Sequence, residues 1–95
     1  MRYFAVIEKR GPSWNDQVPM SGQDKWEEHA AFMNTLVEDG SLVLGGPLVA
    51  GPRVLLIFNL ASKEEIRRRI AGDPWLMMGL LSLVGIEPWE ILLGN

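Results

Sequence analysis

The sequence predicts an α+β fold, a ferredoxin-like βαββαβ sandwich built on one antiparallel sheet. Short runs of apolar, β-branched and aromatic residues alternate with two segments of helical period, in the order strand, helix, two strands, helix, strand. Ninety-five residues leave room for a single domain, taken as 1–95. Hydrophobic residues make up 47% of the chain and charged residues 22%, which is the balance of a globular protein and not of a disordered one.

The first element is a strand over residues 2–8, where aromatic and β-branched residues form a short run. Residues 9–22 follow with many glycines, prolines and short polar side chains, so they predict a loop. Because such a loop is long for a compact domain, we expect a lid or a binding loop.

Residues 23–39 take the period of a helix, and Gly40 is the expected stop. Acidic residues near the start of this segment favour the helix N-terminus through the macrodipole. Four apolar residues at spacings of four, three and four predict the helical face that is buried. They are Trp26, Ala30, Met33 and Val37.

Two strands come next, over residues 42–44 and 54–58. A glycine- and proline-rich corner at residues 45–52 joins them, which predicts an antiparallel pair. The glycines of this corner match neither a phosphate-binding P-loop nor a dinucleotide fingerprint, so they indicate hairpin geometry.

A second helix is expected to begin at Ser62, because Ser62 and Glu65 have the spacing of a capping box. Glutamates in its first turn and arginines toward its end predict favourable pairs four residues apart. These pairs make a solvated helix end a better interpretation of the arginines than a phosphate site. The pairs are Glu64 with Arg68 and Glu65 with Arg69.

The last part of the chain begins with the sequence Asp73-Pro74-Trp75, which breaks the helix. A short helical piece is expected after it, followed by a strand over residues 81–87. Pro88 has no backbone donor, so the segment beyond it should lie at a sheet edge or beyond a bulge.

The sheet is predicted to be covered on both faces, although one chain supplies helices for only one of them. Right-handed crossovers place both helices on the same face. Residues 54–58 are apolar at five consecutive positions, which predicts a strand that is dry on both sides. Each buried aliphatic side chain is worth about 1.5–3 kcal/mol, so a second copy is the expected cover. We therefore predict a homodimer formed sheet against sheet, a dimeric α/β barrel, with a higher assembly of dimers left open.

Composition argues against several classes of partner. The net charge of −3 is the wrong sign for a nucleic-acid-binding protein. With no cysteine, disulfides and thiolate metal sites are excluded, and a single histidine without a carboxylate cluster gives no support for a metal. The apolar runs are too short for a secretion signal or a membrane span. We expect a cytoplasmic protein that binds neither membrane nor nucleic acid.

His29 and Asp73 are the residues best suited to carry chemistry. His29 lies on or beside the apolar stripe of the first helix, and an imidazole titrates near neutral pH, as a general base should. The alternative is a packed histidine bonded to a carbonyl. Asp73 lies between Gly72 and Pro74, where it caps the next turn or orients a histidine. Spacing alone does not decide between these roles.

An ordered set of residues across most of the chain resembles the YCII-related (YciI-like) family. No element is specific alone, but together they span residues 3 to about 93. The resemblance implies a ferredoxin-like fold, a dimeric α/β barrel, and a pocket centred on a histidine and the aspartate of the Asp-Pro motif, here His29 and Asp73. The set is His29, Gly40, Leu42, Gly46-Pro47, Asp73-Pro74-Trp75, Gly79 and Pro88-Trp89.

The resemblance implies acid–base chemistry on a small organic molecule, since a dehydrochlorinase is among the family members of known activity. Elimination, isomerisation or a related rearrangement moves a proton and requires no cofactor. The alternative is a non-catalytic module that binds a metabolite in the same pocket or mediates assembly. In either case, the substrate-binding residues we expect are Trp26, Gly46, Pro47, Trp75 and Met78.

Overall fold

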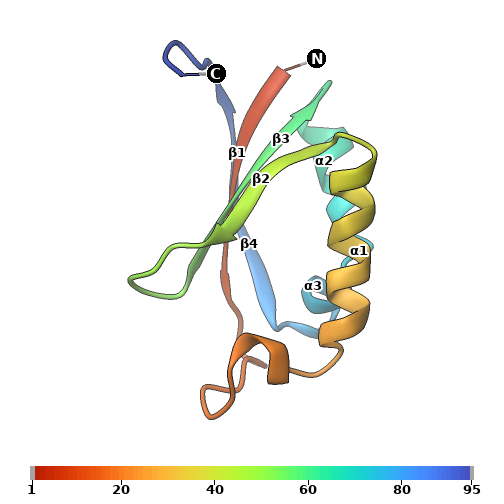
Figure 1. Cartoon of the computed structure of the whole chain (residues 1–95), viewed down its shortest axis with the longest axis vertical. Helices are drawn as coiled ribbons and strands as arrows, with labels where there is room; N and C mark the ends of the chain where they lie inside the picture. The colour runs from red at the N-terminus through yellow and green to blue at the C-terminus, as the bar shows by residue number, and fades with distance from the viewer. Residues whose placement is uncertain (1, 95) are drawn as a thin grey trace.

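The computed structural model describes residues 2–94. Four strands form one antiparallel sheet in the order β2-β3-β1-β4, and helices connect some of these strands along the chain (Figure 1). This is the ferredoxin-like arrangement, so the predicted fold class is confirmed. The elements are β1 (Arg2–Arg10), the 3-10 turn η1 (Met20–Gly22), α1 (Trp26–Glu38), β2 (Leu42–Pro47), β3 (Arg53–Leu60), α2 (Lys63–Ile70), α3 (Pro74–Met78) and β4 (Leu81–Trp89).

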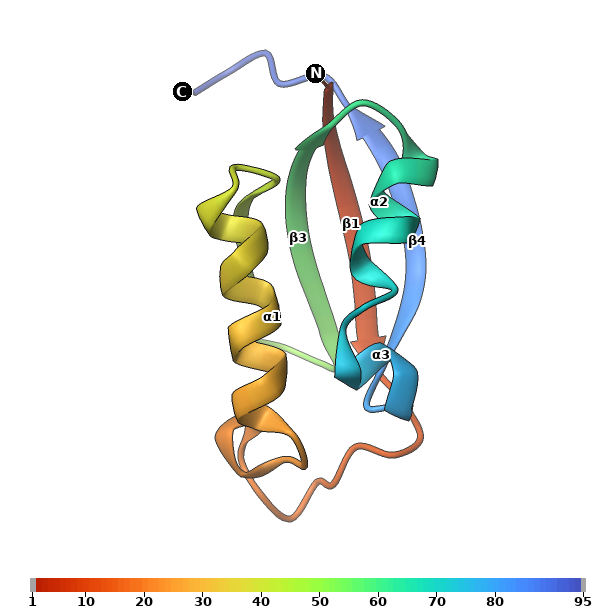
Figure 2. The same cartoon turned by 90° about the vertical axis from the view of Figure 1, so that its right-hand side faces the viewer.

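All three α-helices lie on one face of the sheet, as right-handed crossovers require (Figure 2). The opposite face has no helical cover in the part of the chain that the structure describes. No helix within residues 2–94 has the length and apolar character needed to span a bilayer.

The main core lies between the sheet and the helices. On β1, Phe4 and Val6 point to the helices and are buried because alternate strand residues share a face. α2 adds two residues one turn apart, Ile66 and Ile70. The buried core comprises Phe4, Val6, Leu36, Leu42, Leu56, Phe58, Leu60, Ile66, Ile70 and Ile86.

The apolar stripe predicted for the first helix is only partly correct. Helix α1 begins at Trp26, after Lys25 in a left-handed conformation with φ of 58°. Its one buried residue is Leu36, and Val37, expected to be buried, is 52% exposed. All four stripe residues line a cavity, and only Met33 and Trp26 also pack against buried clusters, which is why the stripe is only partly buried.

The capping box of α2 is confirmed, whereas the ion pairs predicted along that helix are wrong. Ser62 Oγ accepts from the Glu65 backbone N–H at 3.1 Å, and Glu65 Oε1 accepts from the Ala61 N–H at 3.0 Å. Neither Glu64–Arg68 nor Glu65–Arg69 forms a salt bridge within residues 2–94. Glu65 is engaged by the cap, and Arg69 instead donates to Asp39 at the end of α1.

Asp39 thus joins the two long helices at their ends. Hydrogen bonds from Ser41, and after them the Arg69 guanidinium, hold the pKa of Asp39 below its usual range. Because this carboxylate is solvent-exposed, the pair contributes little to stability.

The prediction for the end of the chain is confirmed. Strand β4, in which Pro88 lies opposite Phe4 of β1, is an edge strand, where a residue without a backbone N–H is tolerated. The β1–β4 register shifts between Ile7 and Glu8, which marks a bulge.

Candidate active site

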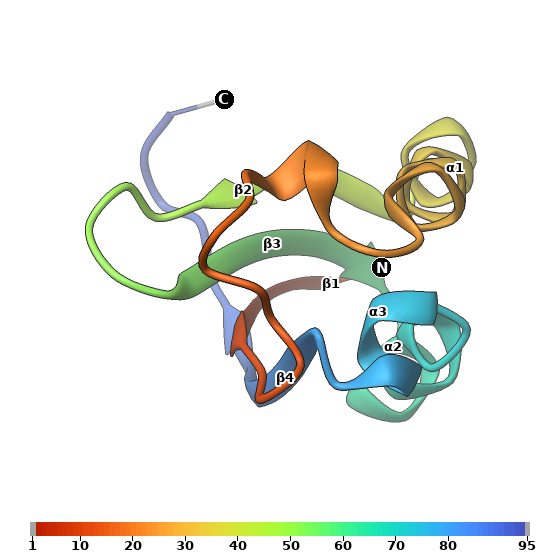
Figure 3. The same cartoon turned by 90° about the horizontal axis from the view of Figure 1, so that it is seen from below.

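A cavity of about 620 Å³ lies between helix α1 and the β2–β3 hairpin. Residues 11–25 cross the end of the molecule between β1 and α1 and supply part of its wall (Figure 3). Most lining side chains are apolar, which suits a small, largely apolar ligand with a few polar groups. Trp14, Met20, Trp26, Ala30, Met33 and Trp75 are among the apolar lining residues, and Glu8, Arg10, His29, Asn34 and Arg53 among the polar ones.

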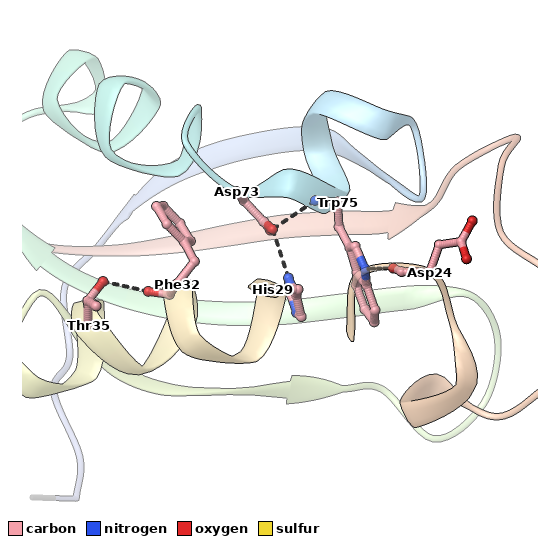
Figure 4. Close-up of polar contacts among 6 residues, drawn as sticks. All are labelled: Asp24, His29, Phe32, Thr35, Asp73 and Trp75. Atoms are coloured by element: carbon pink, nitrogen blue, oxygen red, sulfur yellow. Dashed lines mark hydrogen bonds and ion pairs between the residues drawn. The ribbon is translucent and has the colours of Figure 1, made fainter. Parts of the chain in front are cut away.

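His29 and Asp73, 44 residues apart in the sequence, meet at this cavity. His29 Nδ1 lies 2.8 Å from Asp73 Oδ1 (Figure 4). The same carboxylate oxygen accepts from the Trp75 backbone N–H at 3.0 Å and so caps α3. Because an ionised carboxylate only accepts, a neutral His29 facing an ionised Asp73 would carry its proton on Nδ1. Nε2, on the other side of the ring, is then free to act as a base.

Trp75 fixes the plane of the imidazole. The two rings stack with centroids 3.9 Å apart and planes 5° from parallel. Trp75 is itself held, because its indole N–H donates to the Asp24 carbonyl at 2.6 Å and Trp14 packs edge-on at 5.5 Å. Local sequence explains this geometry: Pro74 at the first helical position and Asp73 at the cap set the direction in which Trp75 leaves the backbone.

The predicted substrate-binding residues divide into two groups. Trp26, Gly46, Pro47 and Trp75 line the cavity. Met78 is absent from the lining that the structure describes, and it packs instead in the cluster of Trp75, Leu80 and Leu81. Asp73 is also outside the lining, since it lies behind His29 and is 1% exposed. Contact of any of these residues with a substrate remains a prediction.

Glu8 is a lining residue that the sequence reasoning missed. It is 2% exposed, and burial, followed by the nearby charge of Asp73, raises its pKa from 4.5 to about 7. A signal was present in the sequence: Phe4, Val6 and Glu8 alternate along one strand and share its inner face.

Two arginines lie at the same cavity. The Arg10 guanidinium is 4.8 Å from the centre of the Trp14 ring, and Arg53 lies at the start of β3. Both favour ligands that carry negative charge. No group of three or more acidic or histidine side chains within residues 2–94 is arranged to hold a metal ion.

Fold and site together define a ferredoxin-like protein with a His–Asp pair at a ligand-sized cavity. Residues 1–90 match the model of the YCII-related domain, and the chain belongs to that family. The resemblance found in the sequence is therefore confirmed. The curated proteins give no match.

Among solved structures that share the fold, a dehydrochlorinase matches over nearly the full length of both chains. It is the 5-chloro-2-hydroxyhydroquinone dehydrochlorinase TftG of Burkholderia phenoliruptrix AC1100, in complex with 2,5-dihydroxybenzoquinone. The TM-score is 0.60 at 20% identity, and the match covers 92% of this chain and 93% of the other. At that identity the likeness establishes the fold alone.

Proposed function

We propose that this protein is a small-molecule enzyme in which His29 is the general base and Asp73 its orienting partner. The observation that carries the proposal is the 2.8 Å contact between His29 Nδ1 and Asp73 Oδ1 at the wall of a 620 Å³ cavity. Asp73 would hold the tautomer that leaves Nε2 free and would stabilise the imidazolium after proton transfer.

The proposed reaction removes a proton from carbon, as in elimination or isomerisation, and needs no cofactor because no electron carrier takes part. A small planar substrate suits the aromatic wall, to which Trp14 and Trp26 contribute indole rings. The dehydrochlorinase of similar fold acts on a chlorinated hydroxyhydroquinone and was solved with a hydroxylated quinone. We propose a substrate of this kind here, a hydroxylated ring or a related cyclic ketone.

The direct test is chloride release from 5-chloro-2-hydroxyhydroquinone by wild type, His29→Gln and Asp73→Asn. General acid–base catalysis contributes about 10²–10⁴-fold, so we expect His29→Gln to lower kcat by at least 100-fold. Asp73→Asn should lower it as well, because the asparagine amide favours the wrong tautomer. Glu90→Gln, exposed after β4, is the matched control and should keep wild-type turnover.

Nitrogen-15 NMR of the imidazole gives a second readout that needs no substrate. We expect the neutral ring to carry its proton on Nδ1 in the wild type and to lose that preference in Asp73→Asn. A ring protonated on Nε2 would contradict the proposed base. Turnover that survives His29→Gln would favour the alternative, a metabolite-binding or assembly module.

We also propose that the chain forms a homodimer through the sheet face that no helix covers. Tyr3 and Trp89 lie opposite each other on this face and are 38% and 46% exposed. Asn59 lies on β3, directly opposite Tyr3 of β1. Its side-chain Oδ1 is buried and has no hydrogen-bond partner within residues 2–94. An unpaired buried oxygen costs about 1–3 kcal/mol, and a second copy would supply both apolar cover and a donor.

Sedimentation velocity tests the dimer. Ala5→Glu places a charge at the centre of the bare face, opposite Ile57 and Glu87 on the neighbouring strands, and should yield monomers. Val49→Glu, on the exposed hairpin loop, should stay dimeric. A wild-type monomer at micromolar concentration would contradict the dimer. We also take residues 1–95 as a single domain. We place the protein in the cytoplasm, and cell fractionation would test that location.

A further inference from the structure

Glu8 is an acidic group in the middle of an otherwise apolar part of the sheet. It lies on β1, one of the two central strands, and its cross-strand neighbours are Val54 on β3 and Leu83 on β4. Phe4 and Val6 precede it on the same face. A core position of this kind normally holds an aliphatic residue, because an unpaired carboxylate is expensive to bury.

Among the residues that the structure describes, the carboxyl group of Glu8 has no compensating partner. Within residues 2–94 its side chain takes part in no hydrogen bond and no salt bridge. What access it retains is to the cavity, whose wall it shares with His29. A buried polar group with no protein partner, facing a ligand-sized space, is the arrangement expected of a group that bonds to a ligand.

We propose that Glu8, in its neutral carboxylic acid form, is a second catalytic residue that donates its proton to a carbonyl oxygen of the substrate. This rests on the proposed function, since it gives His29 a partner acid, and it narrows the substrate class. The substrate would carry a carbonyl oxygen next to the carbon that loses the proton, as an enolisable ketone or the keto tautomer of a hydroxylated ring does.

Protonation is favoured by the surroundings of Glu8. Burial raises its pKa to about 7, and the charge of Asp73 acts in the same direction. The other ionisable groups at the cavity are His29 on α1, Arg10 on β1 and Arg53 at the start of β3. The arginines stay cationic at all working pH values, so they offset part of the charge on an anionic substrate.

His29 Nε2 takes the proton from carbon, and the C–H electrons form a carbon–carbon double bond. The carbonyl π electrons move to oxygen, which takes the Glu8 proton, so the products are an enol, an imidazolium and a carboxylate. When the carbonyl re-forms, Glu8 recovers the proton. Where the substrate forms a dienol, the enol electrons take the imidazolium proton at the far end of the conjugated system, which completes an isomerisation. Where the carbon next to the deprotonated one carries a halide, they form a new carbon–carbon double bond and expel that halide, and the imidazolium releases its proton to water.

The test is the pH dependence of binding of 2,5-dihydroxybenzoquinone, an acid that is ionised well below neutral pH. A donor that must be protonated gives a wild-type affinity that falls about tenfold per pH unit above pH 7. Glu8→Gln keeps an N–H donor but does not titrate, so its affinity should change less than about threefold between pH 6 and 9. Glu8→Leu, which removes the donor, should bind weakly at every pH.

Two further measurements separate this proposal from the role of His29. His29→Gln should lose turnover but keep the pH slope that belongs to Glu8. Carbon-13 NMR of the Glu8 carboxyl should show a titration near pH 7 in the free protein. Binding that is independent of pH in the wild type, an equal slope in Glu8→Gln, or no binding of the probe at pH 6 would each overturn the assignment, whatever His29→Gln does to turnover.

Discussion

The two long helices cover the same face of the sheet but differ in what lies beneath them. Helix α2 places Ile66 and Ile70 in the main core, where both are essentially inaccessible. Helix α1 has thirteen residues and buries only Leu36. Its first turns lie over the cavity instead, with Trp26 and His29 at the wall.

The difference shows that an amphipathic pattern has two uses. On α2 the apolar residues stabilise the fold by packing against the sheet. On α1 only Leu36 enters the main core, with Phe32 and Met33 packed beside it, and the other apolar residues give the cavity its shape. A second cluster, formed by Trp75, Leu80 and Leu81, packs against Trp26 at the start of the helix. Stability should therefore depend mainly on the α2 side, and ligand binding on the α1 side.

The largest effect on stability is expected from Ile66→Ala. Removing a fully buried isoleucine side chain from the main core should cost about 2–5 kcal/mol of unfolding free energy, through lost burial and the cavity left behind. Urea denaturation at fixed protein concentration measures it, since a dimer would make the midpoint depend on concentration.

Val37→Ala is the matched change on α1. Because Val37 is half exposed and borders the cavity, we expect a cost within about 0.5 kcal/mol. Equal losses of unfolding free energy in Ile66→Ala and Val37→Ala would contradict the expectation that stability depends mainly on the α2 side.

The next largest effect is expected from Glu8→Gln, with the opposite sign and a dependence on pH. The folded-state pKa of about 7 lies above the ordinary 4.5, so the folded protein binds the extra proton. The stability that this proton brings is complete below pH 4.5 and is lost as pH rises to 7. The difference corresponds to at most about 3 kcal/mol, so Glu8→Gln should be more stable than wild type at pH 8 and nearly equal at pH 4.5.

Thermal melts at several pH values measure this difference. The same change at the exposed Glu90 is the control and should leave the pH profile as in the wild type. A wild-type protein whose stability does not fall between pH 4.5 and 7 would mean that Glu8 is solvated or paired.

Features that depend on neighbouring residues could be predicted from the sequence. Ser62 and Glu65 identify the start of α2 because the cap involves only residues within one turn. Gly40, with φ of 85°, follows α1 as expected of a glycine after a helix. The order of strands and helices then leaves few topologies, and the ferredoxin-like one was correct.

Features that depend on distant residues were harder to predict. The contact between His29 and Asp73 joins positions 44 apart, and only the packing of α1 beside α3 creates it. Arg69 finds Asp39 on another helix for the same reason. Val37 was misplaced because periodicity identifies an apolar face but not whether a cavity or a core lies under it.

The N-termini of α1 and α2 also differ, and we expect a smaller effect on stability from changes there. Helix α2 begins with the Ser62 side chain as a cap, whereas no side chain caps α1. We expect Ser62→Ala to cost about 1 kcal/mol, which corresponds to about 4–8 °C in Tm for a domain of this size. Ser21→Ala, at an exposed serine of η1, is the control and should leave Tm unchanged. An unchanged Tm in Ser62→Ala would show that packing alone fixes where α2 begins.

A small effect of the opposite sign, a gain in stability, is expected from Lys25→Gly, at the start of α1. Lys25 has φ of 58°, a conformation that glycine adopts without the steric penalty of a Cβ atom. Its ion pair with Glu28 is exposed, with N–O distance 3.5 Å, so little is lost with the side chain. We expect a gain of about 0.5–1 kcal/mol in chemical denaturation. Lys63→Gly, the same change at the first residue of α2, lacks this strain and should lower stability. If both variants have a lower free energy of unfolding than the wild type, the left-handed conformation of Lys25 does not destabilise the fold. The start of α1 would then respond to glycine as the start of α2 does.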